Sequence, residues 1–113
     1  MTRLRSIAAT ALALAVAAPV AAFAQGKSPY DMTYSVRSDT PLRSGMSDGA
    51  GAKGTIPGGT GGIILRWCRP EIPFGKWQFG SRSVKRKLLD ERWCEVEAAG
   101  KVGNVPGKAL RPE

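Results

Sequence analysis

Apolar and polar residues alternate over several short stretches of this chain, a pattern typical of β-strands. The clearest case is residues 93–110, WCEVEAAGKVGNVPGKAL. Within it, Cys94 and Val96 share one face, and the turn at residues 98–101 contains a glycine, which accepts a positive φ. The returning strand ends at Pro106, because proline has no N–H to donate to a neighbouring strand. The pattern predicts a β-hairpin whose apolar face is covered by residues from earlier in the chain.

Further short strands are predicted at residues 33–37, from residue 42, and at residues 54–57. Residues 63–68 form the most strand-like run, because they are rich in β-branched and aromatic side chains. This run lacks clean alternation, which favours a strand covered on both faces. Short strands, frequent glycine turns and almost no helical periodicity predict an all-β fold, a small barrel or sandwich. The residues expected in its core are Val36, Leu42, Ile56, Ile64, Val96, Val105 and Leu110.

The first 24 residues have the pattern of a targeting segment. Arg3 and Arg5 precede an Ala/Leu-rich run, and residues 22–24, Ala-Phe-Ala, supply small residues for cleavage. A membrane anchor or a buried helix is the alternative, but the apolar run is short for a helix that crosses a bilayer. We therefore expect a cleaved signal peptide over residues 1–24, a flexible leader over 25–33 and one domain over 34–113. The expected location is the periplasm or the medium, with no transmembrane segment after cleavage.

Export decides how the two cysteines are interpreted. In an oxidising compartment two cysteines of a small domain usually pair, whereas a metal site needs about four ligands. The chain has two cysteines and no histidine. We therefore expect a disulfide between Cys68 and Cys94, no metal and no cofactor. In a loop-entropy estimate, such a cross-link contributes on the order of 3 kcal/mol to stability.

The formal net charge of the chain is +8, and a large share of its cations lies between residues 66 and 92. Residues 69–92 combine prolines, a glycine, aromatic residues and a Lys-Arg-Lys run. The second half of this segment is either a helical turn or two, capped by Ser81 or Ser83, or an arm of a hairpin.

From residue 34 to residue 110 the chain resembles the bacterial SH3-like (SH3b) domains. Residues 42–45, Leu-Arg-Ser-Gly, are similar to the family's L-x-V-R-S-G segment, and residues 54–60 are similar to its glycine hinge. Residues 93–96 resemble its W-x-K-V strand, and residues 103–105 its G-W-V strand, with Asn104 in place of tryptophan. The resemblance implies a small barrel of about five short antiparallel strands, with residues 69–92 as a long insertion between two central strands.

The resemblance also implies a binding role. Eukaryotic SH3 domains bind proline-rich peptides in an aromatic groove. Trp93 and Pro106 match two positions of that groove, whereas Ala109 replaces an aromatic residue. Related domains often accompany cell-wall hydrolases as separate modules.

Catalysis is not expected, because histidine, the commonest general base, is absent. Our leading hypothesis is a non-enzymatic binding module for peptidoglycan or an envelope protein. The alternative is a small secreted inhibitor or effector that binds an acidic protein through the basic insertion. Export argues against nucleic acid as a partner, and the oligomeric state stays open. The residues expected to bind are Trp93, Pro106, Phe74, Trp77, Phe79, Lys85, Arg86 and Lys87.

Two further alternatives to this hypothesis are a purely structural role of the insertion and a minimal enzyme. The aromatic residues of the insertion could simply cover one end of the barrel while its charges maintain solubility. A minimal enzyme would have to use paired carboxylates, but Glu95 and Glu97 are expected on the solvated face of a strand. The carboxylates concerned are Asp90, Glu91, Glu95 and Glu97.

Overall fold

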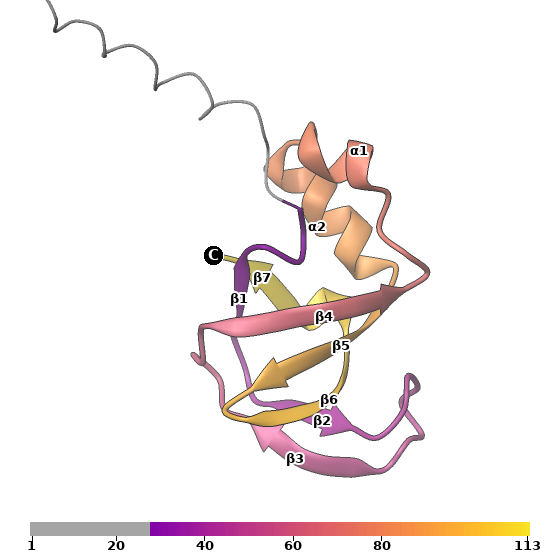
Figure 1. Cartoon of the computed structure of the whole chain (residues 1–113). Coiled ribbons are helices and arrows are strands. Elements are labelled where there is room, and N and C mark those ends of the chain that lie inside the picture. Colours follow the sequence, from indigo (N-terminus) through magenta and orange to yellow (C-terminus); the bar gives the residue numbers. More distant parts are fainter. Residues whose placement is uncertain (1–27) are drawn as a thin grey trace, which may run out of the picture.

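A curled antiparallel sheet makes up most of residues 28–113, the part of the chain that the computed structural model describes (Figure 1). Its seven strands follow the order β3-β2-β6-β5-β4-β1-β7 and form a half-barrel. The all-β prediction is confirmed, with seven strands rather than about five. The predicted signal peptide lies outside the described residues. The strands are β1 (Thr33–Val36), β2 (Thr40–Arg43), β3 (Ala52–Ile56), β4 (Ile63–Arg69), β5 (Trp93–Ala98), β6 (Lys101–Pro106) and β7 (Leu110–Pro112).

The predicted hairpin is β5 and β6. The two strands pair from Trp93 opposite Pro106 to Ala98 opposite Lys101. Its tight turn needs positive φ at two successive residues, Ala99 at 52° and Gly100 at 79°. Glycine adopts this conformation at no steric cost, and the alanine before it does so because the pairing on both sides holds it there.

Strand β4 differs from its prediction in one respect. The strand is not covered on both faces: Ile63 and Leu65 are buried, while Ile64 is 46% exposed. The pairing with β5 shifts between Leu65 and Trp67, which is the mark of a β-bulge. The bulge inserts one residue and so hides the alternation in the sequence. The assignment of Ile64 to the core is therefore wrong, and the neighbours on either side of it take that place.

The other six predicted core residues are buried, and the insertion adds large side chains of its own to the same cluster. Tyr34 and Trp77 are fully buried there, with ring centroids 6.5 Å apart. The hydroxyl of Tyr34 donates to the carbonyl oxygen of Pro29 at 2.6 Å, so residues that precede β1 also pack against the barrel. The insertion is therefore part of the core and not a loop that projects from it.

Residues 69–92 contain two helices, α1 (Phe74–Gln78) and α2 (Arg82–Asp90), which lie together at one end of the barrel (Figure 1). Of the two alternatives for the second half, the helix is confirmed. The hydroxyl of Ser81 caps α2 by accepting from the backbone N–H of Val84 at 3.2 Å. Leu88 and Leu89 of α2 point into the core. Beyond β6, a short 3₁₀ helix, η3 (Gly107–Ala109), packs against α2.

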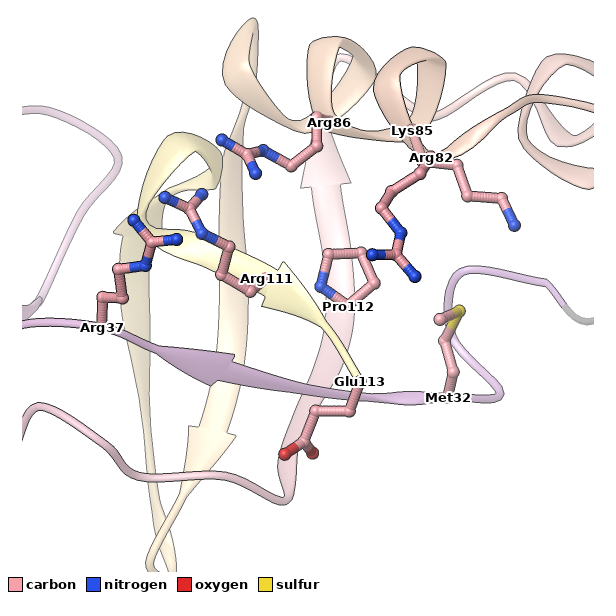
Figure 2. A pocket seen from close by; sticks show the side chains of 8 residues that line it. All are labelled: Met32, Arg37, Arg82, Lys85, Arg86, Arg111, Pro112 and Glu113. Atoms are coloured by element: carbon pink, nitrogen blue, oxygen red, sulfur yellow. The ribbon is translucent and has the colours of Figure 1, made fainter.

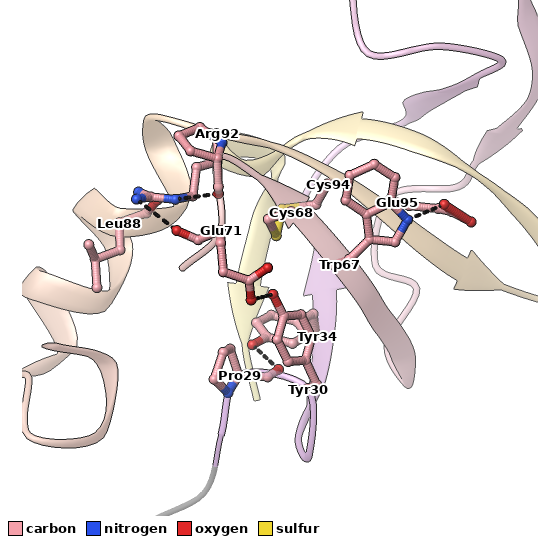
Figure 3. Close-up of a disulfide and its surroundings, with 11 residues drawn as sticks. Pro29, Tyr30, Tyr34, Trp67, Cys68, Glu71, Leu88, Arg92, Cys94 and Glu95 are labelled. Carbon is pink, nitrogen blue, oxygen red and sulfur yellow. Dashed lines mark hydrogen bonds between the residues drawn. A yellow bond between two sulfur atoms is a disulfide. The ribbon is translucent and has the colours of Figure 1, made fainter. Parts of the chain in front are cut away.

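The disulfide between Cys68 and Cys94 is confirmed (Figure 3). The two cysteines are buried and stand opposite each other in the β4–β5 pair, where the insertion leaves the sheet and returns to it. Arg92 adds polar contacts at the same point, because its Nη1 donates to the carbonyl oxygen of Leu88 at 2.7 Å and its Nε to that of Pro70 at 2.9 Å. The base of the insertion is thus fastened covalently and by hydrogen bonds.

Candidate functional site: a cationic pocket

Five cationic side chains from three separate parts of the chain line one pocket of about 390 Å³ (Figure 2). Arg37 follows β1, Arg111 belongs to β7, and three residues come from α2. We call this hollow the cationic pocket. Its lining consists of Met32, Arg37, Arg82, Lys85, Arg86, Arg111, Pro112 and Glu113.

Local structure explains why these side chains meet. On α2, positions 82, 85 and 86 share one face, because residues three and four apart are neighbours on a helix. In the sheet, Ser35 of β1 pairs with Arg111 of β7. Arg37 lies two residues after Ser35 and so on the same side of the chain. Figure 2 shows the guanidinium groups of Arg37, Arg86 and Arg111 turned toward one another.

The positive charge of the pocket is not neutralised from within. In residues 28–113 the two ion pairs are Arg66 with Glu95, at 3.2 Å, and Arg92 with Glu91, at 3.7 Å, and neither involves a pocket cation. Glu113 supplies the one acidic side chain of the lining, and its Oε1 accepts from the backbone N–H of Gly62 at 2.9 Å. This hydrogen bond is the main reason why the pKa of Glu113 is lowered. Five cationic side chains therefore surround the hollow with one acidic side chain at its rim.

The arginines of the pocket also have donors without acceptors. Across the described part of the chain, the Nε atoms of Arg86 and Arg111 are buried and have no hydrogen-bond partner. Burial lowers the pKa of Arg111, and the charges of Arg86 and Arg37 lower it further, while Asp90 acts in the opposite direction. A buried N–H without a partner costs free energy, as do like charges held together. An anion in the pocket would reduce the repulsion between these like charges.

The predicted binding residues of the insertion separate into three environments. Lys85 and Arg86 line the cationic pocket, whereas Lys87 faces a different hollow on the surface of α2. Phe74 and Phe79 are exposed, by 48% and 84%. Trp77 is fully buried, with the Nζ of Lys85 over its ring at 5.5 Å. Trp77 therefore offers no surface to a ligand in this structure, and its place fits the view that an aromatic residue covers one end of the barrel.

Trp93 and Pro106 form a site apart from the cationic pocket. They pair across β5 and β6 and line a small hollow of about 160 Å³. Both acidic and basic side chains share this hollow, so it has no strong charge preference. The other residues of its lining are Asp48, Asp90, Glu91, Arg92 and Lys108.

Besides Phe74 and Phe79, Trp67 is an exposed aromatic residue, and it was not predicted as a surface residue. It is 36% exposed on the outer face of β4, and its Nε1 donates to Glu95 (Figure 3). The guanidinium of Arg69 lies 5.0 Å from the centre of its ring. Because Glu95 also accepts from Arg66 at 3.2 Å, this carboxylate is held by two partners.

Two of the pocket cations, Arg37 and Arg111, were not predicted as binding residues. They are far apart in the sequence, and only the pairing of β1 with β7 brings them together. Arg82 belongs to the basic segment between residues 66 and 92, but it was not predicted as a binding residue. The helical spacing of residues 82, 85 and 86 is the signal that could have found it.

The chain has no significant match among models of known protein families, curated proteins or solved structures. Within residues 28–113 none of the helices is long and apolar enough to cross a membrane. The same residues contain no group of three or more His, Cys, Asp and Glu side chains arranged to hold a metal ion. The candidate site therefore rests on the geometry and charge of the cationic pocket.

Proposed function

We propose that this chain is an exported, non-enzymatic module that binds an anionic component of the cell envelope, a wall polymer or an envelope protein, in the cationic pocket. The observation that carries the proposal is the excess of cationic side chains around one hollow, five against one acidic side chain. Guanidinium groups bind carboxylates and phosphates through paired N–H donors, and a partly buried site strengthens this attraction.

Export is supported by the Cys68–Cys94 bond, since disulfides persist mainly in oxidising compartments. It is further supported by the pattern of residues 1–24. The resemblance to SH3b domains adds that such barrels serve as attached binding modules. Anionic groups are abundant in the envelope, so a cationic pocket has ligands there.

A binding role is favoured over catalysis by the surroundings of the candidate carboxylates. Glu95 accepts hydrogen bonds from Trp67 and Arg66, as a carboxylate with a structural role does. Glu91 contacts Arg92 at 3.7 Å at the base of the insertion. The chain has no histidine to serve as a base in their place. We therefore assign no catalytic residue.

The proposal is tested by retention on envelope material. Protein beginning at Gln25 is incubated with purified peptidoglycan sacculi and, separately, with an immobilised envelope extract at fixed ionic strength. The double variant Arg86→Gln, Arg111→Gln should lose at least tenfold in affinity for the material that retains the wild type. A variant with an equal change in charge at a distance, Lys101→Gln with Lys108→Gln, should bind as the wild type does. Equal loss in both variants would show that net charge, and not the pocket, is responsible, and equal retention would refute the proposal.

A second candidate is a secreted inhibitor or effector that places the basic insertion, residues 69–92, into a cleft of an acidic protein. It is favoured by one observation, the 84% exposure of Phe79 on a segment that has five cations and no acidic residue between positions 72 and 89. The change Phe79→Ser separates the two candidates. It should abolish binding to an acidic protein captured from the extract if the insertion occupies the cleft, and leave binding unchanged if the pocket holds the ligand.

A further inference from the structure

The cationic pocket is built for a doubly charged anion, and we infer that the group it binds is a phosphoryl group rather than a carboxylate. This inference rests on the proposed function and names the chemistry of its ligand. Three properties of the pocket support it: the charge, the arrangement of the donors and the size.

The charge balance requires more than one negative charge. Five cationic side chains and the carboxylate of Glu113 line the pocket, and Glu113 is held by the backbone of Gly62. A carboxylate would cancel one of the remaining positive charges. A phosphoryl monoester carries a charge of about −1.5 to −2 at neutral pH and cancels more of them. Burial first, and then the charges of Arg86 and Arg37, lower the pKa of Arg111. A phosphoryl group therefore reduces the repulsion among these three arginines more than a carboxylate does.

The donors approach the hollow from different elements. Arg86 reaches it from α2, Arg111 from β7 and Arg37 from the end of β1 (Figure 2). A carboxylate is planar and presents two oxygens in one plane, which suits one or two guanidinium groups. A phosphoryl group presents three terminal oxygens on a tetrahedral centre and accepts from three directions at once. The guanidinium ends of Arg37, Arg86 and Arg111 supply the N–H donors for those oxygens (Figure 2).

The size of the pocket indicates that the phosphoryl group belongs to a larger molecule. At about 390 Å³ the hollow exceeds the space of a single phosphate ion, since one water molecule occupies about 30 Å³ in the liquid. Met32 and Pro112 give it an apolar side, which can contact the carbon skeleton of an ester.

Three small anions test the inference in solution: methyl phosphate, succinate and acetate. Methyl phosphate and succinate carry similar charge at pH 7.5, while acetate is the monovalent control, and chloride keeps the ionic strength constant. Binding is followed by isothermal titration calorimetry and by the ³¹P resonance of methyl phosphate. We expect methyl phosphate to bind at least tenfold more tightly than succinate or acetate. Equal or tighter binding of succinate would overturn the phosphoryl assignment and leave the proposed anion-binding function intact. The absence of binding by any of the three would overturn both.

Variants tie the binding to the pocket. Arg86→Lys keeps the charge but loses the paired donors, so methyl phosphate affinity should fall several-fold, and Arg86→Gln should lower it further. Arg37→Gln is the second variant, because Arg37 is exposed and lies outside the helix packing, so its loss leaves the fold intact. Lys101→Gln should leave the affinity unchanged. Unaltered affinity in both Arg37→Gln and Arg86→Gln would refute the site.

Sedimentation with lipid vesicles identifies the source of the group. Vesicles of phosphatidylcholine with 20 mol% phosphatidic acid, as an arbitrary test composition of about one charged lipid in five, present a lipid-borne phosphomonoester. Sedimentation that methyl phosphate reverses assigns the site to a lipid headgroup. Binding of methyl phosphate without sedimentation assigns it to phosphate esters of soluble or wall-bound molecules. Both results support a phosphoryl site, and sedimentation that Arg86→Gln leaves unchanged contradicts it.

Discussion

Gly107 lies at the point where η3 meets the end of α2, and it leaves no room for a larger side chain. A methyl group added at this position would lie 2.1 Å from the carbonyl oxygen of Leu89 and 3.1 Å from that of Arg92, against an ordinary contact distance of 3.4 Å or more. The backbone cannot simply withdraw, because the N–H of Gly107 donates to the carbonyl oxygen of Arg92 at 2.7 Å. The change Gly107→Ala therefore forces α2 and η3 apart.

The cost has three parts. Overpacking of a close contact costs about 1–3 kcal/mol, and loss of the hydrogen bond to Arg92 adds about 1 kcal/mol. The smaller conformational freedom of alanine in the unfolded chain returns about 0.4–1 kcal/mol. These parts sum to a net loss of about 1–3.6 kcal/mol. At the middle of this range, about 2.3 kcal/mol, the Tm of a domain of this size falls by about 10–20 °C.

The assay is thermal unfolding followed by circular dichroism, with urea unfolding for the free energy. Gly49→Ala is the matched control, because a methyl group there meets no atom within 4 Å. Its Tm should stay close to that of the wild type. A Gly107→Ala protein that unfolds within about 3 °C of the control would refute the described packing of α2 on η3. Because α2 also supplies Arg86, the same variant should bind methyl phosphate more weakly than the control does.

Three further predictions concern the disulfide, the tyrosines and the helix cap. The double change Cys68→Ala, Cys94→Ala, with a sequence separation of 26, should lower the free energy of unfolding in urea by about 3 kcal/mol; a loss below about 1 kcal/mol would contradict it. Burial raises the pKa of Tyr30 to about 12 and that of Tyr34 above its usual range, so absorbance at 295 nm should show no native midpoint near pH 10. Since the folded pKa of Tyr30 is raised, its contribution to stability is complete below pH 10, the unfolded value, and is lost as the pH rises toward 12. Ser81→Ala should cost about 1 kcal/mol by removing the N-cap of α2, and an unchanged urea midpoint would contradict this role.

Local patterns were sufficient for the hairpin and the disulfide. Alternation over residues 93–98 places Cys94 on the inner face with Val96, and the structure has both buried. With one possible partner for Cys94 in the whole chain, the pairing followed from the compartment alone. Neither prediction needed to know which strands are neighbours.

Features that depend on pairing between distant parts of the chain could not be predicted from the sequence in the same way. The bulge between Leu65 and Trp67 is defined against β5, so the strand by itself gave no sign that Ile64 points outward. The burial of Trp77 depends on α1 folding back over Tyr34. A segment broken by prolines and a glycine has no long periodicity from which such a return could be read.

The cationic pocket could be predicted from the sequence only in part. Its α2 residues follow helical spacing, whereas Arg37 and Arg111 converge through the β1–β7 pairing. Charge counting located the basic segment correctly and missed the two arginines that complete the hollow.

This origin from three segments has a consequence for the mechanics of the domain. A ligand in the cationic pocket would contact residues next to β1, in β7 and in α2, and so would hold these three segments together. By mass action, ligand at a hundred times its dissociation constant would stabilise the folded form by about 2.7 kcal/mol. Saturated protein should therefore resist proteolytic trimming of its last strand, which is short and lies at the margin of the sheet. Binding of the ligand would then also protect the β1–β7 edge of the sheet.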